Sequence, residues 1–159
     1  MKKILLQCTL GLCLLLMMSC GDDEPTDQQP DEVPETTLDG IWSGTFTDNI
    51  YPSGTFPFTI DVAFVNANTL RGPFYYSGST VSCCNSQDDG EITIEFDGDV
   101  VTKLTMNQDL PFFMGGCPGF YRGSGIIKRI NEFISMDLDF EGEDCEGIHV
   151  GGKLLLSKR

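Results

Sequence analysis

The feature that most constrains this chain is a ten-residue segment, residues 55–64, in which apolar side chains occupy every second position. The alternating apolar residues are Phe56, Phe58, Ile60, Val62 and Phe64. Successive side chains of a β-strand point to opposite faces, so this pattern predicts a strand with one face buried. Pro57 lies on the other face and cannot donate a ladder hydrogen bond, which indicates an edge or the start of a strand.

Similar strand signals recur at short intervals, with turn residues between them. The other segments are 41–46, 70–76, 80–83, 91–96, 100–106, 120–128, 133–140 and 148–156. Two pairs of these segments have the spacing of hairpins, with turns at 97–99 and 129–132. Gly151 and Gly152 indicate a bend or bulge in the last segment. We predict an all-β domain, an antiparallel up-and-down barrel of about eight strands, with a β-sandwich as the alternative.

The chain before this domain has the features of an export signal. Lys2 and Lys3 precede an apolar stretch, residues 4–18. As a helix it would span about 22 Å, too short for a membrane core of ~30 Å. Residues 17–19 before Cys20 resemble the lipobox of bacterial lipoproteins, with Met17 in place of the usual leucine. We predict a signal peptide at 1–19 and lipidation of Cys20; an ordinary signal peptide with a chance cysteine is the alternative.

Residues 20–38 are predicted to be the lipidated cysteine and a disordered acidic linker, because they are rich in acids and proline and poor in apolar side chains. The tract at 21–24 resembles that of surface-exported lipoproteins of the Bacteroidetes. That resemblance implies a lipid-anchored outer-membrane protein exposed at the cell surface. The alternative is that these acids merely begin a solvated linker. The predicted β-barrel domain then covers residues 39–159.

A short motif at the start of the domain adds to the prediction of a barrel. Gly40, Ile41 and Trp42 resemble the Gly-x-Trp signature of the lipocalin superfamily. The resemblance implies that Trp42 closes one end of the barrel and packs against a basic residue late in the last strand, for which Lys158 and Arg159 are candidates. The alternative is that Trp42 is simply a core aromatic residue.

The cysteines of the mature domain are predicted to form disulfides, as an even number in an exported domain suggests. These cysteines are Cys83, Cys84, Cys117 and Cys145. A hairpin centred near Ile130 places Cys117 close to Cys145. Their pairing would leave the adjacent Cys83 and Cys84 free or in a strained vicinal bridge, so we expect instead that each of the adjacent pair bonds one distal cysteine. The adjacent pair lacks the usual spacing of a zinc knuckle, and we predict no metal site.

The charge and the motifs exclude several classes of function. The formal net charge of −14 disfavours nucleic acid as a partner. His149 is the sole histidine of the sequence, and we expect it to be a solvated strand residue on the face opposite Ile148 and Val150. No nucleophile-elbow, P-loop or dinucleotide motif occurs. We therefore expect no enzymatic activity.

Carboxylates gather late in the chain. Asp137, Asp139 and Glu141 alternate along one expected strand face, and more acids follow at residues 143–146. Bound Ca²⁺ would relieve their repulsion, but the EF-hand loop is absent. We expect no cofactor, with Ca²⁺ as the minor alternative.

An aromatic, glycine-rich segment at 109–120 is a candidate lid over the mouth of the barrel. Its lid candidates, with the residue that follows, are Phe112, Phe113, Phe120 and Tyr121. Core packing beneath a loop is the alternative. The resulting hypothesis is a non-enzymatic lipoprotein that binds a small apolar ligand or a partner's segment at one end of the barrel. The alternative is an accessory or inhibitor-type interaction module with a filled barrel.

Overall fold

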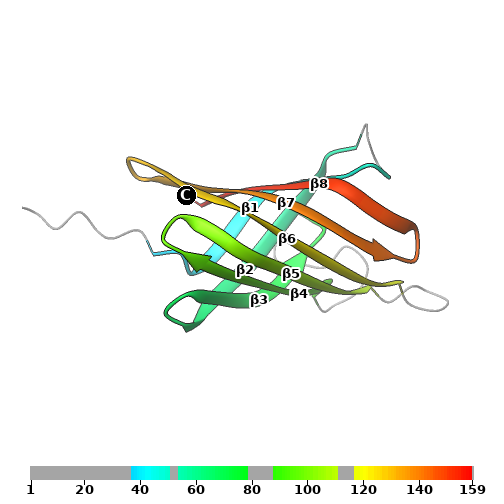
Figure 1. Cartoon of the computed structure of the whole chain (residues 1–159), viewed down its shortest axis with the longest axis horizontal. Coiled ribbons are helices and arrows are strands. Elements are labelled where there is room, and N and C mark those ends of the chain that lie inside the picture. The colour runs from blue at the N-terminus through cyan, green and yellow to red at the C-terminus, as the bar shows by residue number, and fades with distance from the viewer. Residues whose placement is uncertain (1–36, 51–53, 79–87, 111–116, 159) are drawn as a thin grey trace, which may run out of the picture. The chain divides into compact units, whose positions relative to one another are not determined.

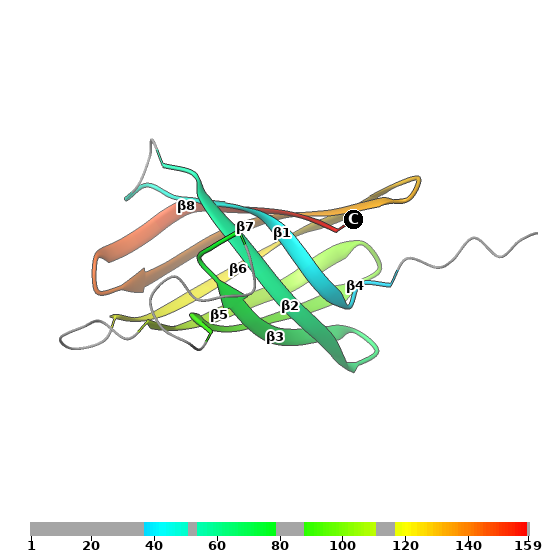
Figure 2. The ribbon, with the colours of Figure 1, turned by 180° about the vertical axis from the view of Figure 1, so that it is seen from behind.

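The computed structural model describes residues 37–50, 54–78, 88–110 and 117–158, which form a closed antiparallel barrel (Figures 1 and 2). The strands are β1 (Gly40–Thr47), β2 (Phe56–Asn66), β3 (Thr69–Tyr75), β4 (Gly90–Asp97), β5 (Val100–Leu110), β6 (Cys117–Ile130), β7 (Phe133–Asp144) and β8 (Gly147–Lys158). Each strand pairs with the next along the chain, and β8 closes the barrel on β1. The predicted eight-stranded up-and-down barrel is therefore confirmed, and the sandwich is not formed. The expected strand at 80–83 lies outside the described residues, as do residues 1–36.

The two ends of the barrel differ in their connections. At one end, here called the turn end, β1 begins, β8 ends, and short turns join β2 to β3, β4 to β5 and β6 to β7 (Figure 1). The other end, here called the loop end, carries the connections between β1 and β2, β3 and β4, β5 and β6, and the turn at Cys145–Glu146. Among the described residues, none forms a helix long and apolar enough to cross a membrane.

Aromatic rings from neighbouring and next-but-one strands meet inside the barrel. Phe46 of β1 stacks on Phe140 of β7 at 4.6 Å between ring centroids and on Phe58 of β2 at 5.9 Å. Phe58 also stacks on Phe74 of β3 at 5.2 Å. The predicted inward face of β2 is correct for Phe58, Ile60 and Val62, whereas Phe56 and Phe64 at its ends are partly exposed. The middle of the barrel is thus filled by side chains of its own wall.

A bulge in β8 reverses which face of the strand points inward. Gly151 has a φ of 62°, and the register between β7 and β8 shifts between Phe140 and Gly142. Leu154 and Leu156 point inward after the bulge, whereas His149 points inward before it. The bulge predicted at this position is confirmed. The expectation that His149 is solvated is wrong, because one extra residue in a strand moves the preceding side chains to the other face.

The turn end is closed over Trp42. The indole is fully buried and donates a hydrogen bond from Nε1 to the carbonyl oxygen of Leu38 at 2.9 Å. The Lys158 ammonium donates to the carbonyl oxygens of Thr37, at 2.8 Å, and of Asp39. These contacts fix the entry of the chain into β1. Packing of a late basic residue against Trp42 stays a prediction, and the other candidate, Arg159, lies outside the described residues.

Candidate functional site

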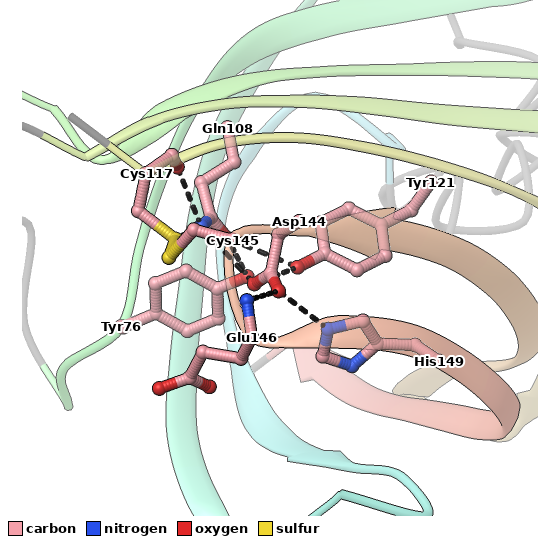
Figure 3. The surroundings of a disulfide bond; sticks show 8 residues. All are labelled: Tyr76, Gln108, Cys117, Tyr121, Asp144, Cys145, Glu146 and His149. Atoms are coloured by element: carbon pink, nitrogen blue, oxygen red, sulfur yellow. Dashed lines mark hydrogen bonds and ion pairs between the residues drawn. A yellow bond between two sulfur atoms is a disulfide. The ribbon is translucent and has the colours of Figure 1, made fainter.

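Polar side chains from many strands converge at the loop end of the barrel. We call this group the polar cluster, and Figure 3 shows most of it around the disulfide. Its members are Asp48, Tyr76, Gln108, Tyr121, Asp144 and His149. Each follows or lies near the loop end of its strand, so closure of the barrel brings together residues that are up to 101 positions apart in sequence.

His149 lies between two carboxylates. Its Nδ1 is 2.6 Å from Asp48 Oδ2, and its Nε2 is 2.9 Å from Asp144 Oδ1, although this second contact lacks the direction of a hydrogen bond. The imidazole is only 2% exposed. Burial alone would lower the pKa of His149, but the two carboxylates outweigh it and raise that pKa above its usual 6.5. The charges of both acids therefore favour an imidazolium at this position.

Asp144 joins the histidine to the tyrosines. Its Oδ2 accepts a hydrogen bond from the Tyr121 hydroxyl at 2.9 Å, and its Oδ1 accepts one from the backbone N–H of Glu146 at 2.8 Å (Figure 3). Burial favours the neutral acid, but His149 and these two donors outweigh it and lower the pKa of Asp144 below 3.8. Asp144 is therefore ionised, and its two carboxylate oxygens are held by Tyr121 of β6, the turn at Glu146 and His149 of β8.

Gln108 is the hub of the neutral half of the cluster. Its Oε1 accepts a hydrogen bond from the Tyr76 hydroxyl at 2.8 Å and lies 3.2 Å from the Tyr121 hydroxyl. Its Nε2 donates to the carbonyl oxygen of Cys117 at 3.0 Å. Burial is the main cause that raises the pKa of both tyrosines, and the charge of Asp144 adds to it, so both hydroxyls stay protonated.

A disulfide joins Cys117 at the start of β6 to Cys145 in the turn after β7, with 5.1 Å between their Cα atoms. The expectation that Cys117 and Cys145 each bond to one of the adjacent cysteines, Cys83 and Cys84, is therefore wrong. The β6–β7 register explains the correction, because it pairs Phe120 with Glu143 and so carries Cys117 next to Cys145. Cys83 and Cys84 lie outside the described residues. Both sulfurs beside Asp144 are oxidised, so this trio is not a thiolate metal site.

The polar cluster rests on an aromatic floor. Tyr121 packs edge-on against Phe140, at 5.7 Å between ring centroids, and against His149 at 5.2 Å. Tyr76 packs edge-on against Phe46 at 5.5 Å. Hydroxyls, an amide and a carboxylate thus lie near the loop end beside apolar rings, and most of them are buried and hydrogen-bonded to one another. This arrangement suits hydrogen bonding to a ligand, whereas both nitrogens of His149 already face carboxylates and neither is placed to act as a general base.

The aromatic lid candidates occupy different places. Phe120 and Tyr121 belong to β6, where Tyr121 points into the interior and Phe120 points outward beneath the Arg122 guanidinium, 4.7 Å from its ring centroid. These two residues form part of the wall and not a connection. Phe112 and Phe113 lie outside the described residues, so a lid formed by them stays a prediction.

The carboxylates considered for Ca²⁺ have cationic neighbours. Lys128 Nζ lies 3.0 Å from Asp137 Oδ2, and Lys153 pairs with Asp139 across the β7–β8 ladder. These lysines offset the repulsion that a bound cation was expected to relieve. A Ca²⁺ requirement therefore has no support from the acidic face of β7.

Sequence reasoning missed Asp48, Tyr76 and Gln108 as members of a site. No motif unites them, since they come from three separate elements. Two signals could have led to the cluster. The predicted bulge at Gly151–Gly152 turns His149 inward, and the closeness of Cys117 to Cys145 places Asp144 at the same end of the barrel.

A second concavity lies on the outside of the wall, near the loop end. This outer pocket has a volume of about 380 Å³. It is lined by Phe120, Arg122, Glu141, Gly142, Glu143, Ile148, His149 and Val150. Ile148 and Val150 are exposed, so the outer pocket combines apolar side chains with charges of both signs.

Comparisons with known proteins give little beyond the barrel itself. No family model matches the sequence, and no curated protein matches it. Among solved structures, the chain is similar to apo shwanavidin, with 10% sequence identity and a TM-score of 0.45 over 76% of this chain and 100% of that chain. The description of the barrel therefore rests on its strand pairing, and that of the site on the contacts given above.

Proposed function

We propose that this chain is a non-enzymatic binding lipoprotein, anchored in the outer membrane through Cys20, whose loop end binds a small ligand. The observation that carries the binding proposal is the polar cluster above its aromatic floor. Tyr76, Gln108 and Tyr121 are preorganised by one another, so a ligand would meet fixed donors and acceptors at little cost in side-chain entropy.

The filled middle of the barrel restricts what the ligand can be. Phe46, Phe58 and Phe140 occupy the space beneath the polar cluster, so the ligand would lie at the mouth and not deep inside. A small molecule with an apolar face for the rings and a polar group for the cluster fits this arrangement. The sequence-based expectation is a small apolar ligand or a partner's segment, and the proposal adds a polar group to that ligand.

A thermal-shift screen of neutral and cationic small molecules against the full chain tests the proposal. A ligand at 100 times its dissociation constant should stabilise the fold by about 2.7 kcal/mol. We expect Gln108→Leu to abolish the shift and Ser157→Ala, at the turn end, to retain it. A screen without stabilising compounds, or shifts of equal size in Gln108→Leu, would refute ligand binding at the loop end.

The outer pocket supports a second candidate, a protein-interaction module. Exposed Ile148 and Val150 beside Arg122 and Glu143 resemble a small interface patch, with apolar anchors and a charged border. Cross-linking in membranes of the native host, followed by mass spectrometry, distinguishes the two functions. An interaction module predicts one partner that is lost in Ile148→Ser/Val150→Ser but retained in Gln108→Leu, whereas a ligand-binding protein predicts no such partner.

A further inference from the structure

The turn end carries large apolar side chains that the barrel does not bury. They are Phe64, Val65, Val100, Ile130 and Phe133, and all lie in or beside the turns that join β2 to β3, β4 to β5 and β6 to β7 (Figure 2). Ile130 and Phe133 face each other across the β6–β7 hairpin and are 66% and 68% exposed. Exposed groups of large apolar residues mark surfaces that contact another phase or another molecule.

Charge distinguishes the two ends of the barrel. Near the turn end, the basic residues Lys103, Lys128 and Arg129 lie beside Glu95, Asp137 and Asp99, respectively, at 2.6–3.0 Å. Asp39, Asp97 and Glu132 also lie at this end, together with Lys158, so it is less acidic than the loop end, and the side chains of Lys103, Lys128 and Arg129 are partly exposed. Near the loop end, the acids greatly outnumber the basic residue Arg122 and His149; these acids are Asp48, Asp88, Asp89, Glu91, Asp109, Glu141, Glu143, Asp144 and Glu146. An excess of acids is repelled by lipid phosphates, whereas apolar tips with lysine and arginine suit the headgroup region.

The direction in which the chain leaves the barrel favours a lipid surface as the partner of the exposed apolar residues at the turn end. Thr37 and Asp39 are held at the turn end by Lys158, so the segment that leads back to Cys20 leaves from this end. From these observations we infer that the turn end is a membrane-contact surface, with the apolar residues at 64–65, 100, 130 and 133 entering the lipid interface and the loop end pointing away from the membrane. This inference rests on the proposed lipidation of Cys20.

The proposed lipid anchor at Cys20 explains how a few apolar side chains at the turn end can orient the barrel on the membrane. Partial entry of an apolar side chain into the interface removes less of its surface from water than full burial does, so each contact is weak by itself. A lipid chain on the same molecule makes the contact intramolecular, with an effective concentration on the order of millimolar. Weak contacts of a few side chains then orient the barrel without binding membranes by themselves.

Tryptophan fluorescence in vesicles tests the orientation with matched variants. Phe133 at the turn end and Ile148 at the loop end are 68% and 69% exposed, so Phe133→Trp and Ile148→Trp add equally accessible probes to the buried Trp42. The full lipidated chain is reconstituted in phosphatidylcholine vesicles with brominated acyl chains, and the emission of the wild type is subtracted. We expect bromine to quench at least half of the added emission in Phe133→Trp and little in Ile148→Trp. Val65→Trp and Val150→Trp, 54% and 51% exposed, repeat the comparison on other strands.

Flotation of the same samples separates the two proposals. If the wild type floats with the vesicles but the paired probes are quenched alike or not at all, the membrane-contact surface is refuted and the anchor stands. If the wild type fails to float, the lipid anchor itself is refuted, and the membrane-contact surface with it.

Discussion

At the scale of single residues, His149 is the side chain on which the polar cluster depends. It supplies the one cationic group between two buried acids, Asp48 and Asp144. Removing one partner from a buried charge group typically costs 3–5 kcal/mol, because the remaining charges are left uncompensated. We expect His149→Leu to lower the free energy of unfolding by about 3 kcal/mol, measured by urea denaturation at pH 6. Val150→Thr, an exposed neighbour, should change it by less than about 0.5 kcal/mol. Equal effects of the two substitutions would contradict a charged cluster.

The same residues predict how stability depends on pH. The folded-state pKa of His149 is raised, so its contribution is complete below about 6.5 and is lost as the pH rises through the folded value. The pKa of Asp144 is lowered, so its contribution is complete above about 3.8 and is lost as the pH falls through its folded value. Asp48 and the neutral Tyr121 are the other titratable groups that face the ring. We expect urea denaturation to show a decline of stability as the pH rises above about 6.5 that disappears in His149→Leu. A decline of the same size in that variant would exclude His149 as its cause.

The position of His149 also shows where residue-level prediction from the sequence succeeds and fails. Ile134, Met136 and Leu138 occupy alternate positions of the predicted strand 133–140 and are all buried, because β7 keeps one register along that stretch. In β8 the glycine pair predicts a bulge, and a bulge reverses the face to which the residues before it point. Simple alternation ignores that reversal and therefore wrongly places His149 in solvent.

At the scale of elements, the Cys117–Cys145 disulfide ties the start of β6 to the turn before β8. In the chain-entropy model, a bridge that closes a loop of 28 residues destabilises the unfolded chain by about 3.6 kcal/mol. We expect Cys117→Ser/Cys145→Ser to lose about that much stability in urea denaturation. Reduction of the wild type under native conditions should reproduce the loss. Peptide mapping under non-reducing conditions that found Cys117 joined to Cys83 or Cys84 would contradict the pairing.

The seam between β1 and β8 depends on close approach at Gly44. A Cβ atom at this position would overlap the backbone carbonyl of Leu155 on the partner strand, which cannot move without breaking the ladder. We expect Gly44→Ala to lower the free energy of unfolding by about 3 kcal/mol or more, at the upper end for point substitutions. Gly98→Ala is the matched control, since a Cβ there meets no atom within 4 Å and costs only the strain of a φ of 56°, about 1 kcal/mol. If chemical denaturation shows a smaller loss of unfolding free energy for Gly44→Ala than for Gly98→Ala, β8 can move away from β1 to accommodate the added Cβ, and this prediction is wrong.

At the scale of the whole molecule, the barrel was predictable and its site was not. Period-two patterning, hairpin spacing and the Gly-x-Trp motif each depend on nearby residues, so they are visible in one sequence. The polar cluster instead depends on closure, which brings Asp48 after β1 next to His149 in β8. Long-range pairing of this kind leaves no local signal. The sequence therefore indicates the barrel, whereas the polar cluster is visible only in three dimensions.

The lipid anchor is the whole-molecule prediction on which display of the loop end depends. Each acyl CH₂ buried in the bilayer contributes ~0.8 kcal/mol, and stable attachment takes more than one chain or a chain with a second contact. We expect Cys20→Ala to abolish metabolic labelling with palmitate and to shift the protein from the membrane fraction to the soluble fraction. Cys13→Ala, within the predicted leader, should leave both unchanged, because only the cysteine after Ser19 has the lipobox context. Labelling that persists in Cys20→Ala would refute the anchor, and labelling lost without release from the membrane would show that the lipid is not what holds the protein there.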